Sequence, residues 1–298
     1  MIEEGIANDA VDIIICAHNS PEDVRRCISS TLISLSPGDR IIVVDDGSAD
    51  ETRELCEIFA EKNPEVLVLI RRPEGSGFCR AANAGIRSAA APIIVLLNSD
   101  TVVPPNWLSR IRACFSANSA IGIVGPLSNA GGWQSIPEFR TGGPPNNRII
   151  SDDATLAEIQ SYCEELSDAY EYPIVDQLNG FCLAIRKEVF DRIGLLDEEH
   201  FPMGYGEEVD FNLRAQDAGF LCAVAIDCFV YHEKTKSYGD DIRERLVSEG
   251  RTHIDRLHGA DRVDVAVKGC QRNPILAAIR DDAQSVFVER QWLVVPGR

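Results

Sequence analysis

VDIIICA, residues 11–17, is a nearly continuous apolar run that ends in the polar turn HNS. A strand buried on both faces loses the alternation of apolar and polar side chains, so this run predicts an inner strand of a parallel sheet. Helix-like stretches separate it from four similar runs, at residues 40–45, 66–71, 92–98 and 121–126. The pattern predicts an α/β fold with a mostly parallel sheet flanked by helices on both faces.

The second half of the chain continues this domain beyond a long loop. Residues 128–152 contain many glycines and prolines and are too long for a plain connection, so we expect a functional loop there. Further elements are expected as a helix over 154–170, a strand over 180–185, a helix over 205–219 and a helix over 240–257. We predict an N-terminal extension at 1–10, a single domain at 11–270 and a tail at 271–298, in which we find no motif.

Composition excludes several classes of protein. The 298 residues are 45% hydrophobic and carry a net charge of −18, so a core is available and general attraction to nucleic acid is not expected. The ten cysteines form no C-x-x-C pair, which favours free thiols over a disulfide scaffold or a zinc site. No apolar run reaches the roughly 18 residues of a membrane helix, so we expect a cytoplasmic protein.

Polar residues follow the first two apolar runs. The first run ends at Ala17 and leads to Asn19 in a strand-to-helix turn, whose backbone N–H groups suit a bound ring or phosphate. The second run ends in Asp45 and Asp46, where a carboxylate suits the hydrogen bonds of a base or a ribose. The same residues would equally serve as turn and cap residues, and both interpretations stay open at this point.

The third and fourth runs lead into a glycine- and arginine-rich segment and a short acidic turn. Residues 71–85 place glycines beside three arginines, but their spacing does not match G-x-G-x-x-G and they follow the third strand, which argues against a dinucleotide site. The fourth run ends in Asn98-Ser99-Asp100, where Asp100 would share a hard cation with a diphosphate. A lone aspartate here also serves as a helix cap, so the metal interpretation depends on the other motifs.

Five motifs follow one another along the chain: CAHN at 16–19, VDDGS at 44–48, GF at 77–78 with Asn83, NSDT at 98–101 and GYGEEVD at 204–210. In this order they resemble family 2 glycosyltransferases of the GT-A fold, over residues 11–259. The resemblance implies a nucleotide-binding sheet and transfer of a sugar from a UDP- or dTDP-sugar. The stretches 125–130, 133–135 and 179–182 look closest to bacterial enzymes that build rhamnose-containing or other surface polysaccharides.

The resemblance implies roles for individual residues. Around the nucleotide it places Ala17, Asn19, Asp45, Asp46, Gly77, Arg80, Asn83, Asn98 and Ser99. Asp100 corresponds to the last acid of the family's D-x-D metal motif, and Asn98 stands at the first, where a neutral amide is a departure that weakens metal binding. The cofactor would be Mg²⁺ or Mn²⁺.

The resemblance also supplies a second metal ligand and its neighbours. His232 lies in a His-x-Lys segment like that of relatives, although by itself it would equally be a structural histidine. Lys234, Lys236 and Arg80 are expected to assist at the diphosphate.

Glu208 matches the position of the family's catalytic base, and Glu207 stands beside it as a second catalytic acid. In an inverting transfer a carboxylate must take the proton of the attacking hydroxyl, and Glu208 suits that role. Acids are also favoured at a helix start by the helix dipole alone, which explains Glu207 and Asp210 better than it explains Glu208.

The expected acceptor is a glycan or a lipid-linked glycan of the cell surface. Trp133 would pack against a sugar ring of the acceptor, although a structural tryptophan is equally compatible with the sequence, and Gly180 is the second residue expected to bind the acceptor. A lipid-linked acceptor would be met by peripheral association at the inner face of the membrane. Two alternatives stay open: a non-catalytic nucleotide-sugar-binding module, because of Asn98, and a sugar-phosphate nucleotidyltransferase, whose basic glycine-rich first loop is missing here.

Overall fold

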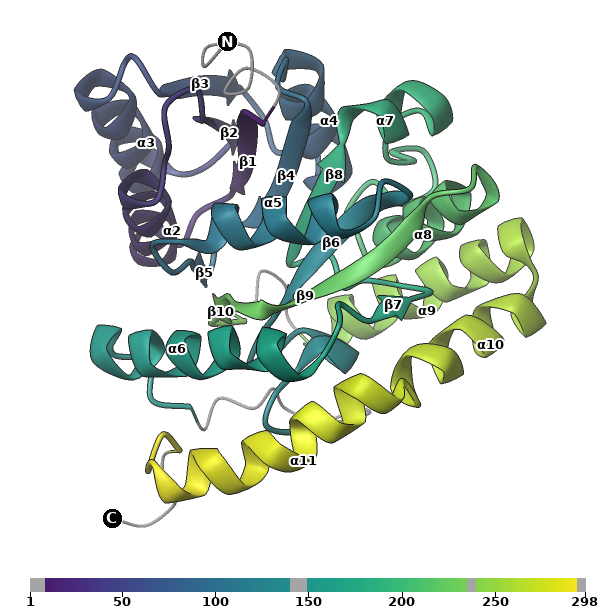
Figure 1. Ribbon diagram of the computed structural model, residues 1–298. Helices are drawn as coiled ribbons and strands as arrows, with labels where there is room; N and C mark the ends of the chain where they lie inside the picture. The colour runs from purple at the N-terminus through teal and green to yellow at the C-terminus, as the bar shows by residue number, and fades with distance from the viewer. Residues whose placement is uncertain (1–8, 140–148, 235–239, 294–298) are drawn as a thin grey trace, which may run out of the picture.

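The computed structural model describes residues 9–139, 149–234 and 240–293 and contains a single α/β domain built on an eight-stranded sheet (Figure 1). Its strands lie in the order β3 (Leu67–Arg72), β2 (Arg40–Asp46), β1 (Val11–Ala17), β4 (Ile93–Asn98), β8 (Cys182–Arg186), β6 (Ile121–Leu127), β9 (Leu221–Phe229) and β7 (Ile174–Val175). Pairs β3–β2, β2–β1, β1–β4 and β6–β9 are parallel, whereas β8 is antiparallel to both neighbours and β7 to β9. The predicted mostly parallel sheet is therefore confirmed.

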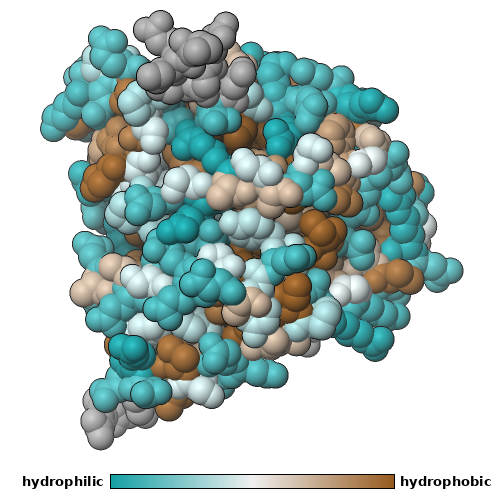
Figure 2. All heavy atoms as spheres, in the orientation of Figure 1, coloured by the Kyte–Doolittle hydropathy of each residue, from teal (hydrophilic) through white to brown (hydrophobic). Residues whose placement is uncertain are grey.

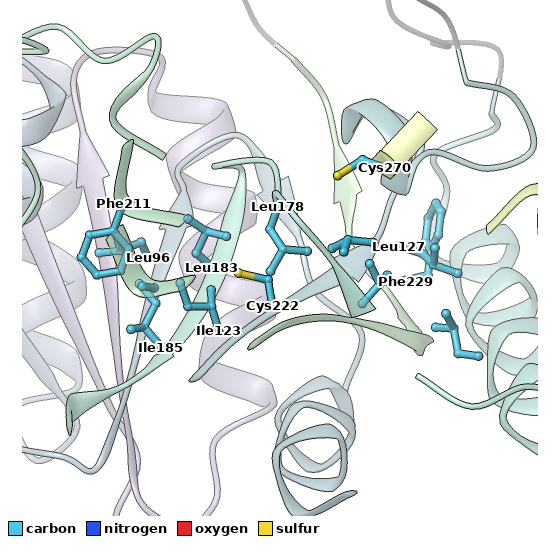
Figure 3. Packing of buried hydrophobic residues seen from close by; sticks show 14 of the residues in the cluster. Leu96, Ile123, Leu127, Leu178, Leu183, Ile185, Phe211, Cys222, Phe229 and Cys270 are labelled. Atoms are coloured by element: carbon cyan, nitrogen blue, oxygen red, sulfur yellow. The ribbon is translucent and has the colours of Figure 1, made fainter. Parts of the chain in front are cut away.

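Helices cover both faces of this sheet. One face carries α2 (Pro21–Ile33), α3 (Asp50–Lys62) and α5 (Trp107–Ala117), and the other carries α4 (Phe78–Ser88), α7 (Lys187–Ile193) and α8 (Glu207–Asp217). Strand β1 shows why both layers form, because Ile13 and Ile15 are buried with the first group and Ile14 with the second. In the second layer, Phe211 of α8 packs in the same cluster as Leu96 of β4 (Figure 3).

Four longer helices extend the second layer: α6 (Asp153–Ala169), α9 (Asp240–His258), α10 (Ala260–Gln271) and α11 (Pro274–Glu289). Helices α6 and α11 lie side by side in the lower part of Figure 1. The Tyr162 hydroxyl donates to Asp282 at 2.8 Å, and Trp292 Nε1 donates to Glu158 at 2.7 Å. These bonds fasten the end of the chain to the domain.

The predicted strands and helices match β1, β2, β3, β4, β6, β8, α6, α8 and α9, with boundaries that differ by at most two residues. We did not predict α10 and α11. A local signal for α11 existed, because the Asn273 side chain accepts from the N–H groups of Ile275 and Leu276 and Pro274 begins the helix. The proposed division at residue 270 stays a prediction.

A small second sheet joins β5 (Thr101–Val102) to β10 (Tyr231–His232) in antiparallel pairing. It lies directly after β4, at the end of the large sheet where the carboxyl ends of the parallel strands β1, β2 and β4 meet. Ligands in open α/β sheets bind at this end. The fold therefore gathers the predicted site residues at one end of the sheet.

The face of the molecule in Figure 2 is mostly hydrophilic. On the face in Figure 2 hydrophobic side chains form small, separate patches. Among the described residues, no helix is both long and apolar enough to span a membrane. All ten cysteines are free thiols, and nine of them are buried.

Candidate active site

The turn after β4 brings Asp100 to the imidazole of His232. The Thr101 hydroxyl donates to the Asn98 carbonyl at 2.7 Å and closes the turn, and His232 stands opposite Thr101 in the small sheet. As a result, Asp100 Oδ1 lies 3.3 Å from His232 Nε2. The two residues predicted as metal ligands, 132 positions apart in the chain, are thus brought together.

The protein fixes the orientation of His232. The Asn129 side chain accepts from the His232 N–H at 2.8 Å and donates to the His232 carbonyl at 2.8 Å. The ring stacks on Phe181 with centroids 5.3 Å apart and planes inclined by 16°. Its Nδ1 lies 3.1 Å from the Ala130 carbonyl, which can only accept, so Nδ1 carries a proton. His232 Nε2 consequently faces Asp100 either as a second N–H or as a lone pair.

This pair fits a divalent cation. A lone pair on Nε2 would face a carboxylate oxygen at 3.3 Å, and a shared cation removes that repulsion. Ligands at about 2.1–2.2 Å on adjacent octahedral positions lie about 3 Å apart, close to the observed separation. Across residues 9–139, 149–234 and 240–293, no cluster of three or more His, Cys, Asp or Glu side chains suits a metal. A two-residue site is typical of an ion whose other ligands are substrate phosphates and water.

Lys234 follows this pair with a positive φ of 59°. Burial and the nearby Arg243 lower the pKa of the Lys234 ammonium, and the charge of Asp100 opposes that shift. Arg243 in turn hydrogen-bonds Tyr205, in the turn that leads into α8. Lys236, also predicted to assist, lies outside the described residues.

The start of α8 presents the two neighbouring acids, Glu207 and Glu208. The turn before it has positive φ at three successive residues, 88° at Gly204, 67° at Tyr205 and 138° at Gly206. The Gly206 N–H donates to Glu207 Oε2 at 3.1 Å and to Glu208 Oε2 at 3.2 Å. Both carboxyl groups therefore gather over the helix N-terminus.

Burial and mutual interaction shift the pKa values of the acid pair, Glu207 and Glu208. Burial and then the charge of Glu208 raise the pKa of Glu207 well above its usual value, while burial also raises the pKa of Glu208. The hydrogen bond between the two raises the pKa of Glu207 and lowers that of Glu208. Glu207 therefore holds a proton more tightly than Glu208 does.

A short series of contacts connects the Asp100 pair to the acid pair. Phe181, which stacks on His232, accepts a hydrogen bond from the Asn98 N–H at 2.9 Å. The preceding residue, Gly180, lies against α8, because a Cβ on Gly180 would be 3.4 Å from the Cβ of Glu208. Phe181 and Gly180 therefore link the Asp100–His232 pair to the start of α8.

The predicted nucleotide residues of β1 and β2 are held tightly by the protein. Both carboxylate oxygens of Asp46 accept from the Ser76 N–H, and one accepts from Gly77 N–H at 2.9 Å. Asp46 also pairs with Arg72 at 3.1 Å. These bonds fix the loop before α4, and a bound nucleoside would have to share the Asp46 oxygens with it.

Asp45 and Asn19 act as turn residues in the structure. The Ser48 N–H donates to Asp45 at 3.0 Å, the Ala49 N–H donates to the Asn19 side chain at 2.9 Å, and the Asn19 N–H donates to the Ser48 hydroxyl at 3.0 Å. The loops after β1 and β2 are thereby joined. Ala17 is fully buried at the end of β1.

The remaining residues that were predicted to bind the nucleotide differ in their exposure to solvent. Arg80 is exposed at the start of α4, and Ser99 is half-buried in the turn beside Asp100. Asn83 is 1% exposed, and its amide donates to the Leu196 carbonyl at 2.9 Å and to Glu198 at 2.7 Å while its oxygen accepts from the Leu196 N–H. Because Asn83 is fully used within the protein, we leave it out of the proposed nucleotide contacts.

Trp133 belongs to a short 3₁₀ turn, Gly132–Gln134. Its indole N–H donates to the Gln177 carbonyl at 2.6 Å, and the guanidinium of Arg280, in α11, donates to the Trp133 carbonyl at 2.8 Å. The indole is partly buried against the core. These contacts position the loop, and the acceptor role of Trp133 stays a prediction.

Three residues of the site were not assigned a role from the sequence. Phe181 supports the His232 ring, Asn129 fixes the His232 main chain and Ser76 binds Asp46. Asn129 lies 103 positions from His232 and Ser76 lies 30 from Asp46, so no local pattern reveals either contact. Two signals were present: Asn129 and Ser76 follow apolar runs, where site residues of α/β sheets gather, and Asn129 and Phe181 lie in the stretches 125–130 and 179–182 that resemble bacterial enzymes.

Comparison with solved structures defines the class. The fold resembles a mannosyltransferase from Pyrobaculum calidifontis in complex with GDP-Man and Mn²⁺, with a TM-score of 0.58 and 16% identity over 92% of this chain and 75% of that one. It also resembles GalNAc-T7 with UDP, GalNAc and Mn²⁺, with a TM-score of 0.59 and 16% identity over 95% of this chain and 58% of that one. The chain therefore has the GT-A fold of glycosyltransferases.

The sequence comparison gives the family. The model of glycosyl transferase family 2 matches residues 12–194, and the chain belongs to this family. An uncharacterized glycosyltransferase, alr2836, of a Nostoc species is 26% identical over 189 residues, which are 63% of this chain and 54% of that protein. The matched region thus spans about half the length of this relative.

Proposed function

We propose that this protein is an inverting, metal-dependent glycosyltransferase that uses a UDP- or dTDP-sugar. The observation that carries the proposal is the Asp100–His232 pair, which Phe181 and its neighbour Gly180 link by contacts to the start of α8. The solved relatives support a nucleotide-diphosphate donor, since one holds GDP-Man and the other UDP, each with Mn²⁺.

In this proposal Glu208 is the base. The acceptor hydroxyl gives its proton to the Glu208 carboxylate as its oxygen bonds to the anomeric carbon, and the bond from that carbon to the diphosphate oxygen breaks with its electron pair on the diphosphate. The Glu207 proton stays on Glu207 and orients Glu208 through their hydrogen bond. Attack opposite the leaving group inverts the anomeric configuration.

Asp100 and His232 would hold the cation, with the donor's phosphates as further ligands. Bound there, Mn²⁺ or Mg²⁺ supplies positive charge for the leaving diphosphate. The carboxylate suits either ion, and the imidazole favours the softer Mn²⁺. Lys234 and the exposed Arg80 are the cationic side chains that we expect to help bind the phosphates.

Nucleotide contacts are proposed at the ends of β1 and β2 and in the loop before α4, from Ala17, Asn19, Asp45, Asp46, Gly77, Arg80, Asn98 and Ser99. The acceptor would be a glycan or lipid-linked glycan for the cell surface, met in the cytoplasm at the inner face of the membrane. This part of the proposal rests on the sequence resemblance to surface-polysaccharide enzymes.

The test is hydrolysis and transfer from UDP-, dTDP- and GDP-sugars with Mn²⁺, with Mg²⁺ and with EDTA. We expect release of nucleoside diphosphate from one donor class only when a divalent ion is present, and an NMR spectrum of the first product with inverted anomeric configuration. Equal release in EDTA would contradict the proposed requirement for a divalent metal ion. Retention of the anomeric configuration would contradict the role of Glu208 as the base.

A further inference from the structure

A cavity of about 210 Å³ lies beside the turn that carries the acid pair. It is bounded by residues 199–204 and by one side of α9. Apolar groups come from Phe201, Met203 and Leu246, and polar groups from Glu199, His200, Glu249 and His253. No function proposed above uses it.

The cavity shares a wall with the proposed active site. That wall includes Gly204, where an added Cβ would lie 3.5 Å from Glu207 Oε2. On the opposite side of the same segment, Gly77 of the nucleotide loop packs against Pro202 and Met203. On the α9 side, Gly250 packs directly against the Tyr205 carbonyl. One thickness of chain therefore separates the cavity from both the nucleotide loop and Glu207.

The lining selects for an uncharged, hydroxylated ligand. Two carboxylates and two imidazoles line it, and no lysine or arginine is among the lining residues, so a phosphate or a carboxylate ligand would be repelled. The exposed carboxylates of Glu199 and Glu249 accept hydrogen bonds from hydroxyl groups, and the exposed imidazole of His200 can donate or accept one. Met203 and Leu246, which are both partly exposed, offer apolar surface for the C–H groups of a ring.

We propose that this cavity is an acceptor subsite that binds one neutral sugar unit of the acceptor glycan, and this rests on the function proposed above. Glu208 does not line the cavity, so the unit bound there is not the one that carries the attacking hydroxyl. Gly204 of the lining lies against Glu207, the neighbour of the proposed base Glu208. The subsite therefore takes a unit next to the reacting one and rejects anionic sugars.

The direct test is ligand-observed saturation-transfer NMR with methyl glycosides. Neutral methyl hexosides and N-acetylhexosaminides are compared with methyl glucuronide on the full chain. We expect a signal from at least one neutral glycoside, with a Kd of about 1 mM, and none from the glucuronide. Leu246→Trp, which fills the cavity, and His253→Phe, which removes its polar nitrogens, should each abolish the signal.

Controls separate this proposal from a folding defect and from the function itself. Thr252→Ala changes an exposed residue next to His253 on α9 and should keep the signal. A thermal shift with Mn²⁺ and UDP, dTDP or GDP reports the nucleotide site in every variant. Should the nucleotide shift persist while no neutral glycoside binds, or while Leu246→Trp binds as well as the native chain, the subsite proposal fails and the proposed function stands. Absence of any nucleotide shift in the native chain would overturn both.

Discussion

The two sides of the proposed cleft use their polar groups in opposite ways. At the ends of β1 and β2, Asp45, Asp46 and Asn19 are paired with protein donors and acceptors. At the start of α8, by contrast, Glu207 and Glu208 share one backbone N–H and crowd two carboxyl groups together under burial.

This difference separates positioning from chemistry. Groups that are satisfied by the protein lower the energy of one conformation and hold the loop before α4 in place. Groups whose pKa is raised by burial and by a neighbouring charge are costly to the fold and reactive toward a proton. We therefore expect substitutions on the β1–β2 side to reduce stability and those on the α8 side to reduce turnover.

The largest expected effect is on turnover, from Glu208→Gln. The amide keeps the shape of the side chain but cannot take a proton, so kcat should fall by about 10²–10⁴-fold with nucleotide binding nearly unchanged. Glu188→Gln, an exposed change on α7, is the matched control and should leave kcat unchanged. Single-turnover assays and nucleotide titrations measure both quantities. A native kcat in the Glu208→Gln protein would mean that another residue is the base.

Asp46→Asn should show the opposite pattern, with a loss of stability. An amide group would turn a donor toward the Ser76 or Gly77 N–H or toward Arg72, so the free energy of unfolding should fall by about 1.5–3 kcal/mol. Urea denaturation measures this loss. Asp45→Asn is the control, because Asp45 accepts a single N–H, from Ser48, and its loss should be smaller. Equal losses in the two variants would remove the distinction we draw for Asp46.

The sequence predicted the strands that carry these residues better than it predicted the contacts between the residues. The apolar runs predicted β1, β2 and β4, because burial on both faces leaves a local pattern, and a similar run predicted the more exposed edge strand β3. The resemblance to the family predicted Asp100 and His232 as ligands of one metal. The bonds from Ser76 to Asp46 and from Asn129 to His232 depend on tertiary packing and leave no such pattern. Helix α11 was missed although Asn273 and Pro274 mark its start. The coupling of Glu207 to Glu208 needs their burial, which a sequence does not give.

The metal pair belongs to the reactive side, and His232→Gln tests whether it is used. Removal of one of two protein ligands should raise the Mn²⁺ concentration for half-maximal hydrolysis by about 10–100-fold. Asn129→Ala, which releases the main chain of His232 and leaves the imidazole, should give a smaller shift in the same direction. Manganese titration of the hydrolysis assay measures both. An unchanged titration for His232→Gln would leave Asp100 without its proposed partner.

The smallest expected effect is a change in how stability depends on pH, from Glu207→Gln. Burial and the charge of Glu208 raise the pKa of Glu207 well above its ordinary value of 4.5, so the folded chain holds this proton more tightly than the unfolded chain. Below pH 4.5 both states are protonated and the side chain adds no pH dependence. As pH rises past 4.5, Glu207 ionises first in the unfolded state. The free energy of unfolding then falls by at most about 1.4 kcal/mol per pH unit, until the pH passes the pKa of Glu207 in the folded state.

Glutamine at position 207 removes that slope. The free energy of unfolding of the variant, relative to that of the native chain, should therefore increase by on the order of 1 kcal/mol as pH rises from about 5 to 7, as measured by urea denaturation at each pH. It should lose some turnover as well, because Glu208 then hydrogen-bonds an amide N–H in place of a carboxylic acid. Two parallel stability curves would mean that Glu207 is ionised in the folded protein. The shared proton would then reside on Glu208, which could not act as the base until it was lost.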